Sequence, residues 1–406
     1  MDHERSPWIE HGGTLGGLRV LDFSRILSGP FCTMALADLG ADVIKVEDHR
    51  KGDDTRSWGP PFQGDEASYF LSVNRNKRSV AVDLKDPECA ALVRRLALSA
   101  DVVVENFRPG TAERLGIGYE ELSAHNPGLV YASISGYGQT GPYRLEPGYD
   151  AIAQAISGMM SITGERDGEP ARTGNSMADL TAGMWATIGV LAALRERDRS
   201  GQGQWVDVSL LDGQIASLTY VAGGYFTTGN VPRRHGAAHP TIVPYQAFPT
   251  SDGRIMVAAG NDTLWKRFAA AIGLGHLTDE PRFATNPDRV AHRDELLPLI
   301  EKAMAERGSA EWEEVLAGAG VPAGPINTVD QALEHPQVAA REMVAETEHP
   351  TAGRVRALSS PVKLSSHPSS VRTPPPTHGE HTDEVLTALG ADASERSRMR
   401  ETGVVR

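Results

Sequence analysis

Residues 18–48 read LRVLDFSRILSGPFCTMALADLGADVIKVED, and this stretch decides the fold. The apolar run Leu18–Phe23 predicts a strand, and Val43–Glu47 predicts a second one. Between them, Pro30 suits the first position of a helix that ends at Gly40. A strand, a helix and a strand in direct succession predict two parallel strands with the helix packed on one face.

The same alternation continues downstream. Further strands are predicted over Ser79–Leu84, Val102–Glu105, Leu129–Ile134 and Trp205–Ser209. Asp86-Pro87 opens a helix that runs to Ser99, and the longest predicted helix covers Asp179–Arg197. The fold class is therefore α/β, with a parallel sheet and helical faces in the manner of a nucleotide-binding domain.

A second, smaller α/β unit is predicted in the middle of the chain. The Gly-, Pro- and Arg-rich segment Val221–His239 is a linker, and a hairpin joins Tyr245–Phe248 to Ile255–Ala258. Three helices then follow, over Thr263–Ile272, Arg293–Glu306 and Ser309–Ala317. We therefore expect a large domain at residues 1–220, a small domain with linkers at 221–335, and a return to the large domain at 336–406.

The composition excludes several classes of protein. With 40 Lys and Arg against 53 Asp and Glu, the net charge of -13 argues against nucleic-acid binding. Two cysteines build no disulfide framework, and no signal peptide is visible at the start. The apolar stretch Gly183–Leu194 is too short to span a bilayer. We expect a cytoplasmic protein with no membrane partner.

Familiar catalytic motifs are missing from the sequence. No GxGxxG follows the first strand, where residues 24–30 read SRILSGP, so a standard dinucleotide site is unsupported. There is no P-loop, HExxH or GxSxG motif. His235 and His239 stand in a Gly-rich segment that reads as a loop, so no metal site is expected.

Two cationic clusters flank predicted strands. Residues 74–79 (NRNKRS) and Lys85 bracket one strand, while residues 105–110 (ENFRPG) end another and Arg114 follows. Ligands of an open parallel sheet bind outside the carboxyl ends of its strands, so both clusters suit a phosphorylated ligand. Phe107 could stack on a base, with Lys85 and Arg114 on phosphates. The alternative is that these charges are solvated at the rim of the domain.

A third cluster, residues 174–183 (GNSMADLTAG), opens the longest helix, with Asp179 at the position of an N-cap. The helix dipole and free N–H groups favour the ionised carboxylate, and the small neighbours leave room for a bulky acyl group. From the residues alone, Asp179 is either a nucleophile or a capping residue.

Taken in order and spacing, these segments resemble class III (CaiB/BaiF-type) coenzyme A transferases, from about Leu15 to Gly390. The resemblance is carried by residues 17–47, NRNKRSVAVDLK at 74–85, VENFRPGTAERLGIGYEEL at 104–122, RTGNSMADLTAGMWATIGVLAALRER at 172–197, GVPAGPINTVDQALEHPQ at 320–337 and GEHTDEVLTALG at 379–390.

The resemblance implies a large Rossmann-like, CoA-binding domain whose parallel sheet is formed by both chain ends, a small central domain, and two subunits threaded into an interlocked homodimer. Asp179 takes the place of the family's nucleophile, and Leu27 and Tyr149 lie near the substrate. The family's CoA contacts fall on Ile26, Val82, Lys85, Asn106, Phe107 and Arg114. Asp48 departs from the pattern, because formyl-CoA transferases carry an arginine there, near the adenine.

The implied reaction moves CoA from an acyl-CoA to a carboxylic acid, through a mixed anhydride and then an aspartyl-CoA thioester on Asp179. CoA is a substrate, and no bound cofactor, ATP or metal is needed. Formyl-CoA transferases have a glycine-rich loop where residues 257–262 read VAAGND, and a Gln at Leu27. We therefore expect a larger acid, with succinyl-CoA as donor.

Two alternatives carry different functions. α-Methylacyl-CoA racemases share the fold but need a histidine in a GHD sequence, where this chain has Gly148-Tyr149-Asp150. A tyrosine, with a reference pKa of about 10, is a poor replacement for a histidine near neutral pH. The other alternative is a CoA-binding paralogue without catalysis, which the intact motif around Asp179 disfavours.

Overall fold

The computed structural model describes residues 6–406, and the chain forms two compact units. The large unit contains the chain up to Met159, Thr173–Phe226 and Pro336–Arg406, and the small unit contains Met160–Arg172 and Thr227–His335. Residues 160–172, which we expected in the large domain, pack with the small unit.

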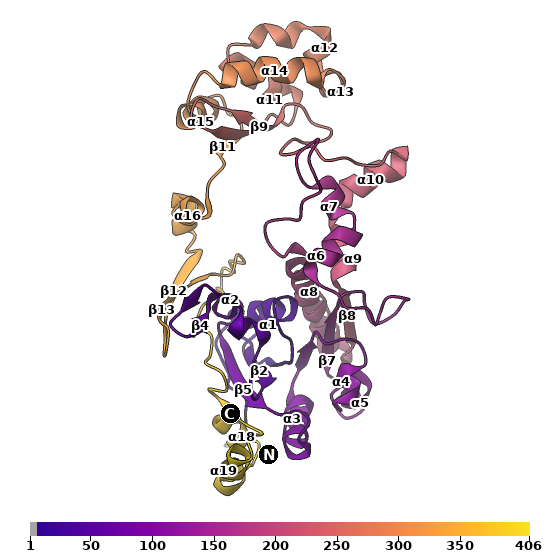
Figure 1. The fold of residues 1–406 in the computed structure, drawn as a ribbon, viewed down its shortest axis with the longest axis vertical. Coiled ribbons are helices and arrows are strands. Elements are labelled where there is room, and N and C mark those ends of the chain that lie inside the picture. The colour runs from indigo at the N-terminus through magenta and orange to yellow at the C-terminus, as the bar shows by residue number, and fades with distance from the viewer. Residues whose placement is uncertain (1–5) are drawn as a thin grey trace. The chain divides into compact units, whose positions relative to one another are not determined.

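A six-stranded parallel sheet forms the centre of the large unit (Figure 1), in the order β5-β2-β1-β6-β7-β8. Its strands are β1 (Arg19–Asp22), β2 (Asp42–Asp48), β5 (Lys77–Val82), β6 (Val102–Glu105), β7 (Val130–Ser135) and β8 (Trp205–Ser209). Every residue of β5 and β7 is buried, as expected of a parallel sheet covered on both faces. Counted along the chain, the order is 3-2-1-4-5-6, the Rossmann arrangement, whose switch point lies between β1 and β6.

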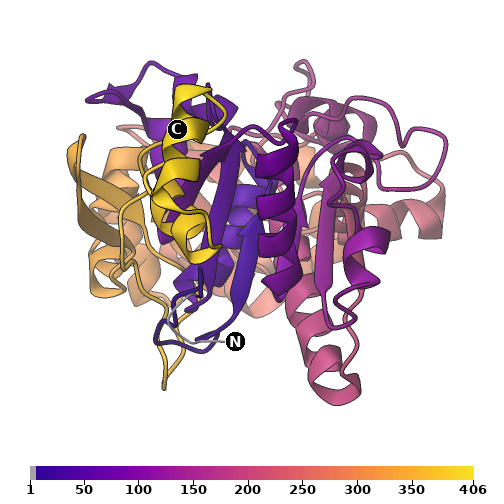
Figure 2. The same ribbon diagram turned by 90° about the horizontal axis from the view of Figure 1, so that it is seen from below.

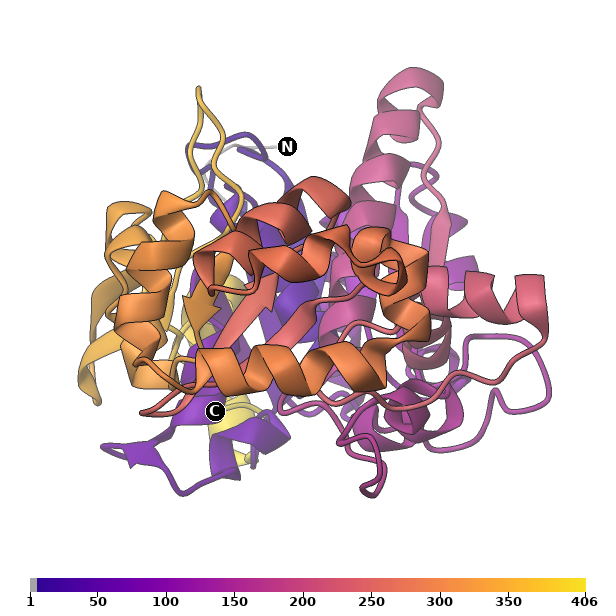
Figure 3. The same ribbon diagram turned by 90° about the horizontal axis from the view of Figure 1, so that it is seen from above.

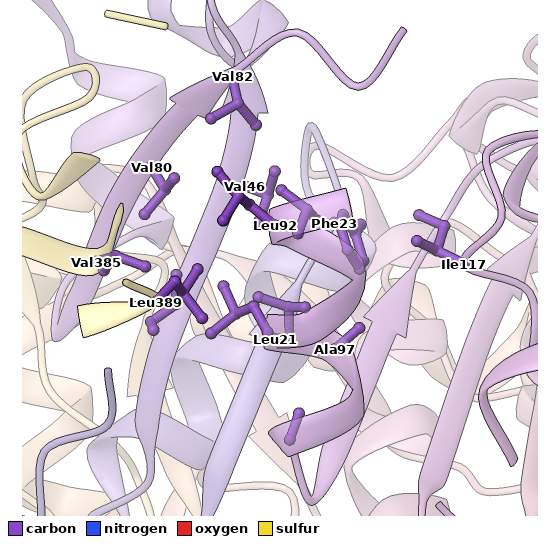
Figure 4. Close-up of a cluster of buried hydrophobic side chains, with 14 of the residues drawn as sticks. Leu21, Phe23, Val46, Val80, Val82, Leu92, Ala97, Ile117, Val385 and Leu389 are labelled. Atoms are coloured by element: carbon purple, nitrogen blue, oxygen red, sulfur yellow. The ribbon is translucent and has the colours of Figure 1, made fainter. Parts of the chain in front are cut away.

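Each face of this sheet is covered by helices from distant parts of the chain. On one face, Figure 2 shows α3 (Pro87–Ser99) with the C-terminal helices α18 (Thr382–Ala388) and α19 (Ala393–Glu401). Figure 4 shows how Leu92 of α3 and Val385 of α18 meet Val46 and Val80 of the strands in one buried cluster. On the other face pack α1 (Ser28–Asp38) and α8 (Met177–Ser200).

Helix α8 is longer than the apolar stretch suggested. By length and composition alone its 24 residues could cross a membrane, which the run Gly183–Leu194 did not indicate. One face carries Ala178, Ala182, Ala186 and Val190, which are buried against the sheet. The helix therefore packs as a core helix does, in keeping with its central place in the large unit.

The C-terminal segment contributes no strand to the parallel sheet, so the expectation that both chain ends form it is wrong. All six strands come from residues 19–209. The C-terminal segment instead contributes α18, α19 and one isolated antiparallel bridge between Val82 and Val405. Around that bridge, Asp83 N–H donates to Val404 O at 2.8 Å and Arg406 N–H donates to Ala81 O at 3.1 Å.

Shorter elements complete the large unit. They are η2 (Asp54–Ser57), β3 (Phe62–Gln63), β4 (Glu66–Ala67), α2 (Ser68–Val73), α4 (Thr111–Arg114), α5 (Tyr119–Ser123), α6 (Asp150–Ile156), α9 (Leu210–Ser217), α17 (Pro336–Ala340), β12 (Val344–His349) and β13 (Gly353–Leu358). Helices α7 (Met159–Ile162) and α10 (Thr219–Thr228) lie at the boundaries between the units.

The small unit has a three-stranded sheet in the order β11-β10-β9, from β9 (Tyr245–Pro249), β10 (Arg254–Ala258) and β11 (Ala323–Pro325). All of its pairings are antiparallel, so it is an α+β unit rather than the α/β unit that we expected. Figures 1 and 3 show helices α11 to α14 on one side of this sheet. The unit's helices are α11 (Asp262–Ala271), η3 (Gly275–Asp279), α12 (Pro281–Ala284), α13 (Asn286–Ala291), α14 (Arg293–Met304), α15 (Ser309–Gly318) and α16 (Val329–Leu333).

Candidate active site

The loops that follow β1 and β6 meet at the switch point of the large sheet. Asn106 holds them together, because its Oδ1 accepts from Arg25 N–H at 2.8 Å and its Nδ2 donates to Arg25 O at 2.7 Å. Beneath them the buried Lys45 donates to Ser24 O at 2.6 Å and pairs with Asp53 at 2.9 Å. These contacts hold Ile26 at a φ of 71°, a strained conformation for a β-branched residue.

A cavity of about 790 Å³, part of it open to solvent, lies beside this loop. Its ionisable lining residues are Arg108, Arg144, Glu146, Tyr149, Asp150 and Asp179. Ile26, Asn106 and Phe107 line it as well, so three of the predicted CoA contacts lie beside the predicted nucleophile.

A second cavity, of about 810 Å³, lies outside the carboxyl ends of β1, β2, β5 and β6. It contains Val82, Lys85 and Asp48, and it shares Phe107 with the first cavity. One ring therefore borders both spaces.

Asp179 is not the N-cap of its helix, as its sequence position suggested. Helix α8 begins at Met177, its N-cap is Ser176, and Asp179 stands in the first turn. Burial, with the nearby charge of Asp150, raises the pKa of Asp179 to about 7, against a hydrogen bond from Ser28 that lowers it. The carboxylate is thus poorly solvated and lies on the wall of the cavity.

Close packing of α1 against α8 brings Ser28 to this carboxylate. A side chain at Gly183 would place its Cβ 2.6 Å from Ser28 O, so only glycine permits this approach. The Ser28 side chain is buried and takes part in the hydrogen bond to Asp179.

The NRNKRS cluster at residues 74–79 is structural, and its interpretation as a ligand site is wrong. Arg75 pairs with Asp38 at 2.5 Å, Lys77 with Asp22 at 3.0 Å, and all five residues 74–78 are buried. They also lie at the start of β5, away from the carboxyl end where a ligand binds. Burial lowers the pKa of Lys77 to about 8, opposed by Asp22.

Three other predicted residues lie in different surroundings. Leu27 is buried with Met34 and Val73 and lines neither cavity. Tyr149 is 63% exposed at the mouth of the first cavity. Arg114 is exposed on α4, where its guanidinium donates to Thr111 Oγ1 at 2.8 Å, next to the second cavity.

Among the residues of the first cavity that the sequence did not predict are Ser28, Arg108, Arg144 and Asp150. Arg108 belongs to the ENFRPG cluster and Asp150 to the GYD sequence, but neither pattern indicated a role for these two residues. Arg144 lies in an irregular loop, where no periodic pattern marks it. Within residues 6–406, no group of three or more His, Cys, Asp or Glu side chains is placed to hold a metal ion.

Known proteins resemble this chain over most of its length. The family model for CoA-transferase family III matches residues 15–382. The chain is 45% identical to succinyl-CoA:glutarate CoA-transferase of Mus musculus over 392 residues, 96% of this chain and 90% of the relative. It is 43% identical to succinate–glutarate CoA-transferase of Agrobacterium fabrum over 381 residues, 92% of this chain and 95% of the relative.

Among solved structures, a CAIB/BAIF family protein from Brucella suis superposes with a TM-score of 0.84 at 41% identity, and the match covers 93% of this chain and all of that one. The match to the family model and the identity to these relatives extend over nearly the whole chain. The chain belongs to CoA-transferase family III.

Proposed function

We propose that this CoA-transferase moves coenzyme A from succinyl-CoA to a second dicarboxylic acid, with Asp179 as its covalent nucleophile. The observation that carries the proposal is the place of the Asp179 carboxylate, on the wall of a cavity that adjoins a second one through Phe107. The similar enzymes from mouse and Agrobacterium, whose names pair succinyl-CoA or succinate with glutarate, support the choice of substrates.

CoA is proposed to lie in the second cavity, with its thioester in the first. Lys85 and the nearby Arg114 would hold phosphates, and Val82 and Phe107 would contact the apolar parts of the ligand. Asn106 would act chiefly through the loop that it fixes. Asp48 lines the same cavity. Burial alone would raise the pKa of its carboxyl group, but hydrogen bonds from the N–H groups of Lys51 and Arg50 outweigh burial and lower that pKa. A carboxylate there disfavours a phosphate on that side.

The first half of the reaction loads CoA onto the enzyme. A carboxylate oxygen of Asp179 attacks the thioester carbonyl of the donor, the C–S bond breaks, and a mixed anhydride and the CoA thiolate result. The thiolate then attacks Cγ of Asp179, and the donor acid leaves as a carboxylate. The products are an aspartyl-CoA thioester and the free acid.

The second half reverses these steps with the acceptor. The acceptor carboxylate attacks the aspartyl carbonyl and releases the thiolate, which then attacks the acceptor carbonyl and frees the Asp179 carboxylate. Each step exchanges one activated carbonyl for another, and no proton is gained or lost overall. The residues that bind and orient the substrates therefore supply the catalysis.

Arg108 and Arg144 are proposed to select dicarboxylic acids. Both line the cavity of Asp179, and among residues 6–406 neither guanidinium makes an ion pair. An unpaired guanidinium offers two N–H donors in a plane that matches a carboxylate. Arg144→Gln should raise the KM for glutarate at least tenfold and that for valerate much less, and an equal change for both acids would contradict this role.

A homodimer in the cytoplasm is also proposed. In the large unit, Trp185 and Ile188 of α8 and Phe226 of α10 are 47%, 54% and 81% exposed, which leaves apolar area open to solvent. A second copy of the chain would cover it. Both cysteines, Cys32 and Cys89, are free and buried, which suits a reducing compartment.

Trapping of the covalent intermediates tests the mechanism. With succinyl-CoA and no acceptor, the peptide that contains Asp179 should carry an adduct, which hydroxylamine converts to a hydroxamate and borohydride reduces. Asp179→Asn should form no adduct while it still binds CoA, because the proposed CoA contacts lie on other elements. An Asp179→Asn variant with full transfer activity would refute the assignment.

A further inference from the structure

Helix α8 receives its cap from another helix. Its own N-cap, Ser176, makes no side-chain capping bond, and Asp179 provides none. Instead, the N–H of Ala178 donates to Asp150 Oδ1 at 2.8 Å, across from the first turn of α6. Asp150, from another element, thus caps an N–H group in the first turn of α8.

Asp150 is fixed at both of its oxygens. Oδ2 accepts from Gln154 Nε2 at 2.8 Å, and the fully buried Gln154 accepts in turn from Thr173 N–H at 3.0 Å and Thr173 Oγ1 at 3.1 Å. The carboxylate therefore keeps one orientation, in the wall of the cavity that Asp179 also lines. Two carboxylates therefore line one cavity.

We propose that Asp150 is a positioning residue, which holds a second negative charge against Asp179 so that the acylated enzyme is favoured over the free one. The inference rests on the proposed covalent mechanism. When the aspartyl-CoA thioester forms, the charge on Asp179 leaves with the released acid, and the repulsion between the two side chains ends. The charge of Asp150 thereby shifts the loading equilibrium toward the covalent intermediate.

Other groups also face Asp179. Ser28 on α1 donates a hydrogen bond that opposes the effect of Asp150. Tyr69 on α2 is held neutral, because burial first and then the charges of Asp179 and Asp150 raise its pKa to about 12. On the loops, Arg108, Arg144 and Glu146 line the same cavity. The two arginines are exposed to solvent, which screens them, whereas the Asp150 oxygens are held in hydrogen bonds beside the helix terminus.

The equilibrium can be measured directly. Intact-protein mass spectrometry gives the ratio of aspartyl-CoA enzyme to free enzyme at set ratios of succinyl-CoA to succinate. Asp150→Asn keeps an oxygen for the Ala178 N–H but removes the charge, and it should lower the loading constant by about tenfold, the equivalent of one pKa unit. Asp198→Asn, an exposed charge on the same helix, is the matched control and should leave the constant unchanged.

A second measurement follows the loading constant against pH, first in the unaltered protein and then in Asp150→Asn. The loading constant should rise with pH and level off only above about pH 7, where Asp179 is ionised, and in Asp150→Asn the plateau should begin at lower pH. A role that is only structural would move neither the constant nor the plateau.

The outcomes are distinguishable. A normal adduct whose constant is the same in Asp150→Asn, or one that does not change with pH near neutrality in the unaltered protein, would overturn this inference and leave the proposed function intact. A complete absence of adduct in the unaltered protein would overturn both.

Discussion

Asp179→Asn should stabilise the folded protein at alkaline pH. Asp179 carries a folded-state pKa of about 7, against a usual value of 3.8, because burial and Asp150 disfavour its charge. Between these values the folded state binds more protons than the unfolded state, so this group makes stability fall as pH rises from about 4 to about 7. Three pKa units at 1.36 kcal/mol each give a cost of up to about 4 kcal/mol above that window.

The asparagine variant avoids this cost. Its advantage in the free energy of unfolding should grow from about 1 kcal/mol or less near pH 4.5 to about 4 kcal/mol near pH 8.5. Urea unfolding at both pH values, at one protein concentration, measures it, with Asp198→Asn as the exposed control on the same helix. A variant less stable than the unaltered protein by the same amount at both pH values would show that the Asp179 carboxylate caps the helix, and would refute the reasoning.

Three further results are expected. Arg114→Ala should weaken CoA binding by about 1–3 kcal/mol in calorimetry, through loss of a charge-assisted phosphate contact, and an unchanged affinity would remove Arg114 from the site. The enzyme should not exchange the α-proton of 2-methylacyl-CoA in deuterated water, because Tyr149 replaces the racemase histidine, and exchange as fast as turnover would contradict this. Sedimentation should show a dimer whose stability rises with protein concentration, and an active species of 43.6 kDa would exclude it.

Local signals predicted much of the large unit. The strand, helix and strand of residues 18–48 became β1, α1 and β2, and the Asp86-Pro87 pair opens α3 with Asp86 accepting from the N–H groups of Glu88 and Cys89. These features depend on residues that are close together in the sequence, so local residue types are enough to predict them. The hydrogen bond between Arg25 and Asn106 joins two different loops, so predicting it would also have required the order of the strands.

Long-range pairing accounts for what was missed. Arg75 and Lys77 carry the positive charge that a phosphate site needs. Their partners lie elsewhere, because Asp38 of α1 pairs with Arg75 and Asp22 of β1 pairs with Lys77. Nothing in residues 74–79 themselves indicates these pairs. Asp179 was placed at an N-cap because helix ends are read from local residue types, whereas the cap of α8 comes from Asp150, 28 residues upstream. A side chain that acts on another element leaves no local pattern.

The bridge between Val82 and Val405 has a consequence for biosynthesis. Strand β5 is the outer strand of its sheet, and at its end the N–H of Asp83 donates to Val404 O while Ala81 O accepts from Arg406 N–H. A nascent chain therefore carries this end of β5 unpaired until more than 300 further residues have been made. Unpaired strand edges invite pairing with other chains, so the ribosome-bound intermediate is the stage at which a chaperone is most needed.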